Sequence, residues 1–256
     1  MAKEPTFEKE TDLCAAFIAS LPKGWVAYPE TGGFDIVLRR EADGFQIGIE
    51  AKLRLNAKVI TQVAEGTSHY AVAMPGPDCR AVLIPDGVSM DLASILPLLG
   101  ITAITMRFDG GNHKAGWRTS PFSPSLPTLN DSYSGSSWYE RCPAKRLELP
   151  DWVPDVAAGS SAPVALTPWK VKAIKIAVLL EKRGYVTRQD FAHFQISMSR
   201  WTQEGWIKKD GNGGWIASRL PDFKAQHPVN YSQIEADFEK WKPANAMTQR
   251  GLFNAA

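Results

Sequence analysis

Apolar and polar residues alternate with two different periods along the first part of the chain. Residues 5–21 carry apolar side chains at helical spacing, on one side of the expected helix: Phe7, Leu13, Phe17 and Leu21. The Pro-Lys-Gly triplet at 22–24 ends this helix. Runs rich in β-forming residues then predict strands at 25–29, 34–39 and 45–53, and an Asp-Gly dipeptide marks a turn between the last two.

Helices and strands alternate over the residues that follow. The pattern predicts helices at 56–66 and 90–99, and strands at 69–74, 80–85 and 101–108. A meander of strands followed by such an alternation predicts an α/β domain with a mixed sheet over residues 1–108.

The next sixty residues, 109–168, lack periodicity and are dense in Pro, Ser and Gly. Long stretches of this kind are usually linkers or functional loops. We therefore expect a mostly irregular linker that joins two separable units. Four aromatic residues in it are expected to act as local packing anchors: Trp117, Trp138, Tyr139 and Trp152.

Residues 169–220 show a compact pattern of three helices followed by a hairpin. The first predicted helix, 169–183, ends at Gly184, and Thr187 and Ser197 are placed to cap helices at 188–194 and 198–204. Strands at 206–209 and 215–217 flank an Asp-Gly-Asn-Gly-Gly turn. Residues 221–256 are expected to form a tail with one helix at 231–241.

Composition describes a globular chain without a strong bulk charge. Apolar residues make up 44% and charged residues 22%, and the formal net charge is only +2. Any affinity for nucleic acid must therefore come from local patches. The three cysteines are far apart and form no metal-ligand or disulfide pattern. The polar N-terminus and the absence of a long apolar run predict a cytoplasmic protein without a membrane partner.

Three charged residues stand out because of their places in the predicted strands. In a strand, residues i and i+2 share a face, so Glu50 and Lys52 project to one side, and Asp35 lies on the neighbouring strand. Two carboxylates that meet on a sheet repel each other unless a cation neutralises them. Hard oxygen ligands suit Mg²⁺, and Lys52 can orient a water or offset the charge of a phosphate. A surface ion pair between Glu50 and Lys52 is the plain structural alternative.

These residues resemble the motif of the PD-(D/E)xK, or restriction-endonuclease-like, nuclease superfamily. Its pattern is an Asp at the start of one strand and Glu-x-Lys on the next, which matches Asp35, Glu50 and Lys52; Phe34 replaces the proline of the pattern. The resemblance covers roughly residues 5–108. It implies a metal-dependent nuclease with Asp35 and Glu50 as ligands of Mg²⁺, for which Mn²⁺ can substitute.

The resemblance also points to further residues around this motif. Many members place a helical Glu near the metal, a role that Glu10 would fill here, with Glu8 as its competitor. A polar residue on the helix after the motif often touches the DNA, and Gln62 has this position. Glu30 is a weaker candidate because it precedes the Asp strand. An exposed helix face is the alternative for Glu10 and Gln62.

The order of elements at 169–220 resembles winged-helix DNA-binding modules. In such modules the third helix enters the major groove and the hairpin lies along the backbone. This implies that Ser199, Arg200 and Gln203 meet DNA bases, and that Lys208 and Lys209 meet phosphates. Use of this module for protein contact is the alternative. Trp201 and Trp206 are expected in its core.

The sequence therefore predicts an α/β protein with a restriction-endonuclease-like core and a small winged helix-turn-helix domain. Its expected function is Mg²⁺-dependent hydrolysis of DNA phosphodiester bonds, most simply as an endonuclease. The alternative is a non-catalytic DNA-binding regulator with an inactive nuclease fold. The sequence leaves open the DNA substrate and whether the chain forms a homodimer.

Overall fold

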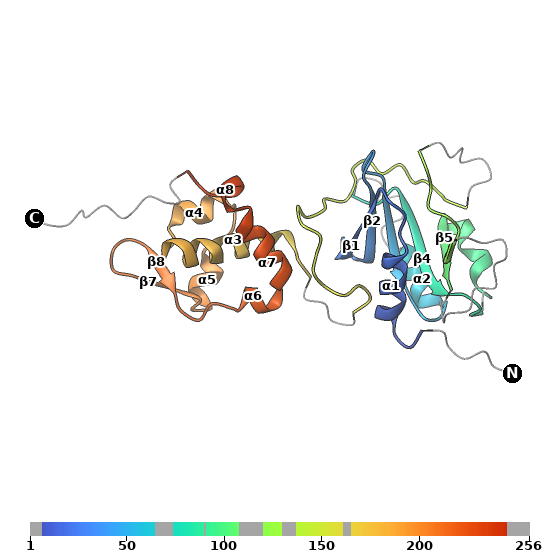
Figure 1. The fold of residues 1–256 in the computed structure, drawn as a ribbon, viewed down its shortest axis with the longest axis horizontal. Coiled ribbons are helices and arrows are strands. Elements are labelled where there is room, and N and C mark those ends of the chain that lie inside the picture. Colours follow the sequence, from blue (N-terminus) through green and yellow to red (C-terminus); the bar gives the residue numbers. More distant parts are fainter. Residues whose placement is uncertain are drawn as a thin grey trace, which may run out of the picture. The chain divides into compact units, whose positions relative to one another are not determined.

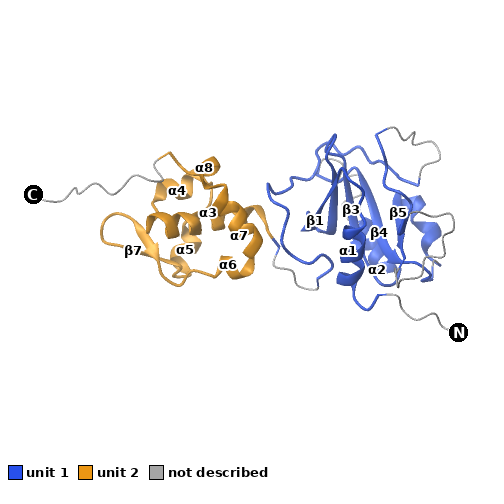
Figure 2. Ribbon diagram, viewed as in Figure 1, with its two compact units in different colours: residues 1–165 blue, residues 166–256 orange. Residues whose placement is uncertain are grey.

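The computed structural model describes residues 7–64, 74–89, 91–107, 120–129, 137–160 and 165–244. The chain divides into two compact units, residues 1–165 and 166–256, which Figure 2 colours separately. None of the helices in these ranges is long and apolar enough to cross a membrane.

The first unit is built on a mixed six-stranded sheet in sequence order, β1 to β6 (Figure 1). The first three strands form an antiparallel meander, β3, β4 and β5 run parallel, and β6 is antiparallel to β5. The strands are β1 Trp25–Thr31, β2 Phe34–Arg40, β3 Gln46–Ala51, β4 Cys79–Pro85, β5 Ile101–Met106 and β6 Phe122–Ser123. The predicted mixed α/β sheet is thus confirmed.

Two helices cover opposite faces of this sheet. Helix α1, Glu10–Ala19, packs its buried residues against alternate positions of the sheet, such as Ile47 and Ile49, in one core cluster. Helix α2, Ala57–Ala64, packs against the other face, where Val82 of β4 is buried in a second cluster. This alternation agrees with the period of two along a strand. Glu50, next to Ile49, therefore lies on the α2 face.

One predicted element of this unit needs correction, and another lies almost wholly outside the described residues. In place of the helix expected at 90–99, the chain forms two short 3₁₀ turns, η2 Ala93–Ile95 and η3 Pro97–Leu99. Pro97 has no backbone N–H to continue a helix, which explains the break. The strand expected at 69–74 lies almost wholly outside the described residues.

The described parts of the segment 109–168 are mostly irregular, as predicted, but they pack on the first unit and do not form a separate linker. Leu126, Trp138 and Ala158 are buried in the core of the first unit, and β6 extends its sheet. Leu147 also exchanges two hydrogen bonds with the side chain of Gln46, of 2.9 and 3.0 Å. The boundary between the units therefore falls at residues 165 and 166, after the segment instead of across it.

The second unit begins with three helices and a hairpin, in the predicted order. The helices are α3 Pro168–Arg183, α4 Arg188–His193 and α5 Ser199–Gln203, and the hairpin strands are β7 Ile207–Lys209 and β8 Trp215–Ala217. Gly184 ends α3 with φ 82°, and Thr187 caps α4 in a reciprocal box with Asp190. Trp201 is fully buried, as predicted, whereas Trp206 is half-buried.

The tail expected after residue 220 belongs to this unit. The helix predicted at 231–241 is divided into α7 Pro228–Ala236 and α8 Phe238–Trp241, and a short helix α6 Phe223–Gln226 precedes them. Helix α7 contacts α3, and Phe223, Tyr231, Ile234 and Phe238 are buried. Residues 221–241 are therefore part of the fold of the second unit.

Candidate functional site

Three carboxylate residues occupy one row across the antiparallel meander. The pairing of β2 with β3 sets Ile36 opposite Ile49, so the next step along the strands sets Asp35 opposite Glu50. In β1, the residues on either side of Glu30 pair with the residues on either side of Asp35. Like charges directly opposite each other in a sheet are destabilising. This row, Glu30, Asp35 and Glu50, therefore calls for a neutralising cation.

Lys52 supplies one positive charge beside this row. Its Nζ lies 2.9 Å from Oε2 of Glu10, 3.5 Å from Oδ2 of Asp35 and 2.8 Å from the carbonyl oxygen of Ala51. Burial alone would lower the pKa of Lys52, but the hydrogen bond to Glu10 and the charges of Asp35 and Glu10 outweigh it and raise the pKa. Lys52 is therefore a protonated donor at neutral pH.

Asp35 is held at the end of the strand pair by the backbone of β3. Its Oδ2 accepts a hydrogen bond of 2.8 Å from the N–H of Ala51, and 14% of its side chain is exposed. The structure thus brings together Asp35, Glu50, Lys52 and Glu10. We call these four residues with Glu30 the acidic centre.

Glu50 is the most buried carboxylate of the acidic centre. Only 2% of the residue is exposed, and its Oε2 has no hydrogen-bond partner. Burial first, and then the charge of Asp35, raise the pKa of Glu50 to about 8. A buried carboxyl group with an unused oxygen is costly unless it is protonated or coordinates a cation.

Glu30 completes the acidic centre, and Cys14 lies close to its carboxylates. Burial and the charge of Asp35 raise the pKa of Glu30, although a hydrogen bond from the N–H of Ser160 opposes this. The Cys14 thiol is buried one helical turn after Glu10, and burial together with the nearby carboxylates raises its pKa. Cys14 is therefore a protonated thiol that packs beneath the charged groups. Because Cys14 follows Glu10 by one helical turn, its spacing in the sequence could have predicted its place beside the acidic centre.

The donor set of the acidic centre suits a hard divalent cation. Among the described residues, no group of three or more His, Cys, Asp and Glu side chains stands ready to hold a metal ion. Mg²⁺ does not need such a cage, because it commonly takes one or two carboxylates and keeps several waters. Asp35 and Glu50, with the unpartnered oxygen of Glu50, provide ligands of this kind. Lys52 already offsets part of their charge.

Two sequence candidates lie apart from these contacts. Gln62 is on the exposed side of α2, and no hydrogen bond or ion pair joins it to the acidic centre within the described ranges. Glu8 is exposed just before α1, whereas Glu10 bonds Lys52. The structure therefore favours Glu10 over Glu8 as the helical partner of the motif.

The candidates for DNA contact in the second unit are all exposed: Ser199, Arg200, Gln203, Lys208 and Lys209. Arg200 is not free in solvent, because its guanidinium lies 4.8 Å from the ring centre of Trp169 and 5.5 Å from that of Trp206. Such cation–π contacts restrain an arginine while leaving its donors available. Lys208 and Lys209 are neighbours on β7 and so point to opposite faces of the hairpin.

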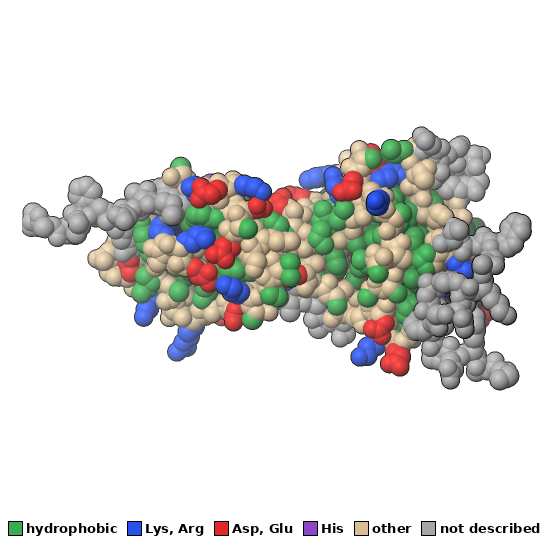
Figure 3. All heavy atoms as spheres, viewed as in Figure 1, with side chains coloured by type: hydrophobic (Ala, Val, Ile, Leu, Met, Phe, Trp, Pro, Cys, Tyr) green, Lys and Arg blue, Asp and Glu red, His purple; other side chains and the backbone are tan. Residues whose placement is uncertain are grey.

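Basic side chains do not gather into one stripe on the visible face of the second unit. In Figure 3, Lys and Arg alternate there with Asp and Glu. This agrees with the small net charge of the chain. Affinity for a polyanion would therefore depend on a few placed residues, such as Arg200, more than on bulk charge.

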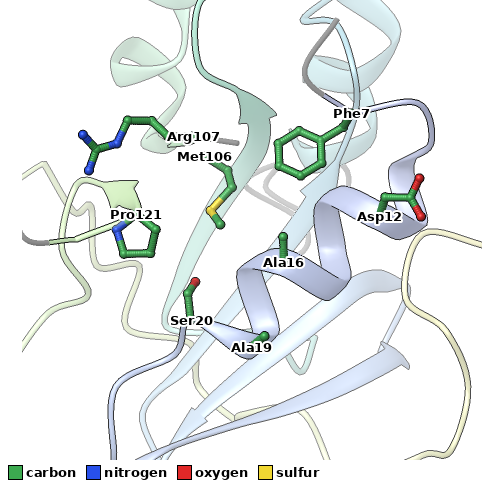
Figure 4. Close-up of a pocket in the computed structure, with 8 residues that line it drawn as sticks. All are labelled: Phe7, Asp12, Ala16, Ala19, Ser20, Met106, Arg107 and Pro121. Carbon is green, nitrogen blue, oxygen red and sulfur yellow. The ribbon is translucent and has the colours of Figure 1, made fainter. Parts of the chain in front are cut away.

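A pocket of about 330 Å³ lies elsewhere in the first unit, between α1 and the end of β5 (Figure 4). Its walls come from the side of α1 that does not carry Glu10 and from the segment around β6. The lining residues are Phe7, Asp12, Ala16, Ala19, Ser20, Met106, Arg107 and Pro121. None of the acidic-centre residues lines it, so this pocket is separate from the acidic centre.

Comparison with known proteins adds no relative to this description. No protein-family model, no curated protein and no solved structure matches the chain.

Proposed function

We propose that the chain is a Mg²⁺-dependent DNA nuclease with a restriction-endonuclease-like core. The observation that carries this proposal is the acidic centre itself. Asp35 and Glu50 lie opposite each other, Lys52 bonds Asp35, and a buried oxygen of Glu50 has no partner. An ordinary surface ion pair would not bury Glu50 to 2% exposure.

Each residue of the motif has a distinct task in this proposal. Asp35 and Glu50 would hold Mg²⁺, or Mn²⁺ as a substitute. A cation held there would supply an activated water and would neutralise charge on the scissile phosphate. Lys52 remains an ammonium because its pKa is raised. It therefore donates a hydrogen bond to the phosphate or the attacking water and does not act as a base.

Glu10 acts on this site through Lys52. Its carboxylate accepts a 2.9 Å hydrogen bond from Nζ, and 34% of the side chain of Glu10 is exposed. Such a partner fixes the direction of a long, flexible side chain. Glu10 would thus hold Lys52 beside Asp35 while leaving the open side of the site to the substrate.

We further propose that the second unit is a winged helix that binds duplex DNA. Three helices and a hairpin in this order support the assignment, and Ser199, Arg200 and Gln203 on α5 are exposed. Arg200 would reach base edges from its restrained position over Trp169. Lys208 on β7 would meet a phosphate.

A non-catalytic DNA-binding protein is the second candidate function. It is favoured by the lack of a ready group of three metal-ligating side chains among the described residues. In that case Lys52 would be a permanent counterion of Asp35 and Glu50, and the acidic centre would serve stability alone.

A cleavage assay separates these functions. We expect the full chain to cut DNA with Mg²⁺ or Mn²⁺ and to be inactive in a chelator. Substrates should include linear, nicked, branched and single-stranded DNA. Asp35→Asn and Glu50→Ala each remove a metal ligand and should abolish cleavage, while Glu41→Ala, on the exposed turn after β2, serves as the matched control. Full activity in a purified, folded Asp35→Asn or Glu50→Ala protein would refute the assigned chemistry.

A further inference from the structure

A short segment, residues 158–160, is built into the wall of the acidic centre. Ala158 is 4% exposed and belongs to the same core cluster as Cys14. Gly159 follows with φ 74°, and a Cβ added there would lie 3.1 Å from Sγ of Cys14 and 3.2 Å from the backbone carbon of Glu10. A side chain at this position would crowd α1 and would strain the backbone at this φ, so glycine suits the close approach of the segment to α1.

Glu30 holds the end of this segment. Its Oε1 accepts a hydrogen bond of 3.2 Å from the N–H of Ser160, 130 residues farther along the chain. The backbone of Gly159 lowers the pKa of this carboxyl group as well. The segment therefore contacts two members of the acidic centre at once, Glu10 through packing and Glu30 through the hydrogen bond from Ser160.

The backbone of Glu30 is itself unusual. Its φ is 48°, inside a β-strand, and residues with a Cβ rarely adopt this left-handed region. Such conformations persist where the surroundings hold them, and they are common at functional sites. Here the distortion falls opposite Asp35 in the carboxylate row. It accompanies the hydrogen bond that Glu30 accepts from the N–H of Ser160.

From these contacts we infer that Glu30 is a positioning residue, which fastens residues 158–160 against Glu10 and thereby holds Glu10 and Lys52 in their places. The consequence for catalysis rests on the proposed nuclease function. Glu30 and Glu50 differ in their hydrogen bonds. The carboxylate of Glu30 already has a backbone partner, whereas Oε2 of Glu50 has none. Glu30 thus acts through the segment, and Asp35 and Glu50 remain the ligands.

The test uses the full chain and the variants Glu30→Ala and Glu30→Gln. Alanine has the same backbone restriction at φ 48° as glutamate, so this variant removes the acceptor without relieving the backbone. Glutamine keeps a carbonyl acceptor and removes the charge. Gly159→Val displaces the segment through crowding against α1 and backbone strain, and leaves the carboxylate of Glu30 in place. Glu41→Ala is the matched control for loss of an exposed carboxylate.

The first measurement is hydrogen–deuterium exchange of the peptide that contains Gly159 and Ser160, without any metal. Glu30→Ala and Gly159→Val should speed exchange of these amides, and Glu30→Gln and Glu41→Ala should leave it near that of the wild type. Unchanged exchange in Glu30→Ala would overturn the inference. This readout does not depend on nuclease activity, so it decides the contact even if the chain cuts no DNA.

The second measurement is cleavage at saturating Mg²⁺. Loss of a group that orients a metal-site residue typically costs about 10-fold to 100-fold. We expect Glu30→Ala to lower kcat by that range with little change in KM for DNA, and Glu30→Gln to restore most of the rate. If Glu30→Gln were as inactive as Glu30→Ala while its segment stayed protected, Glu30 would be a ligand, and the inference would be wrong. An inactive wild type would instead contradict the nuclease proposal alone.

Discussion

The ammonium group of Lys52 donates hydrogen bonds to acceptors from three segments of the chain. Glu10 comes from α1, Asp35 from β2, and the carbonyl of Ala51 from the end of β3. An ammonium in this place allows several carboxylates to lie close together without a metal. No hydrogen bond joins Glu50 to Lys52. Glu50 is therefore the carboxyl group of the acidic centre that is hardest to ionise.

The buried carboxyl of Glu50 predicts an unusual dependence of stability on pH. Its pKa is about 8 in the folded chain, against 4.5 for an ordinary glutamate side chain. Between these values the folded state binds more protons than the unfolded state, so the free energy of unfolding falls as pH rises. Glu50→Gln has no proton to lose. It should therefore unfold at a higher temperature than the wild type at pH 8 in a chelator, and show a flatter pH profile.

Thermal unfolding at pH 5, 6, 7 and 8 measures this difference, with Glu41→Gln as the control. Each kcal/mol of stability should appear as about 2–4 °C in Tm for units of this size. Mg²⁺ should raise the Tm of the wild type more at pH 8 than at pH 6, because metal and proton compete for Glu50. Parallel pH profiles for the wild type and Glu50→Gln would show that Glu50 titrates normally.

Part of the acidic centre could be predicted from the sequence and part could not. Strand periodicity and the short hairpin place Asp35 and Glu50 opposite each other, and Lys52 two residues beyond Glu50. The role of Glu30 could not be predicted with the same means. It depends on a positive φ within a strand and on a hydrogen bond donated by the N–H of Ser160, and neither leaves a local pattern in the sequence.

At the scale of elements, α5 and the hairpin of the second unit decide whether that unit can meet DNA. Helix α5 has only five residues, and its buried Trp201 anchors it in an aromatic cluster. Its exposed residues flank this anchor. The end of α3 and the start of α4 were predictable because Gly184 and Thr187 have strong capping preferences. The cap position predicted at Ser197 was wrong, because α5 begins after Met198, whose side chain makes no capping hydrogen bond. The 3₁₀ turns at 93–99 were not predictable, because the apolar periodicity of this segment concealed the effect of Pro97.

Single substitutions in α5 and β7 should have different effects on DNA binding by the full chain in a chelator. Arg200→Ala should weaken binding by about 1–3 kcal/mol and relax any sequence preference. Lys208→Ala should weaken binding to all sequences alike and reduce the salt slope by about one. Lys182→Ala is the control, because Lys182 on α3 forms an ion pair with Glu235 on α7. Fluorescence anisotropy at several salt concentrations measures these effects. Wild-type affinity in all three variants would make the second unit a protein-contact module.

At the scale of the whole molecule, a proline-, serine- and glycine-rich composition did not mean an independent linker. Trp138 is 4% exposed, and its indole N–H donates to the carbonyl of Ser125 over 2.8 Å. Arg141 and Lys145 add backbone hydrogen bonds to the loop before β4. Irregular chain of this kind is held by long-range contacts, which composition does not reveal.

Limited proteolysis of the full chain should reflect this organisation. Because residues 137–160 pack on the first unit, we expect the first cut between residues 160 and 166, with fragments close to 1–165 and 166–256. Mass spectrometry of the early products identifies the site. First cuts within 137–160 would instead support the linker that composition suggested.

The hydrogen bond that Glu30 accepts from Ser160 has a consequence for the order of folding within the first unit. It joins residues that are 130 positions apart. Contacts between residues so distant along the chain form more slowly than local contacts such as those of a strand hairpin. The acidic centre should therefore gain residues 158–160 only after the strand pair that carries Asp35 and Glu50 has formed.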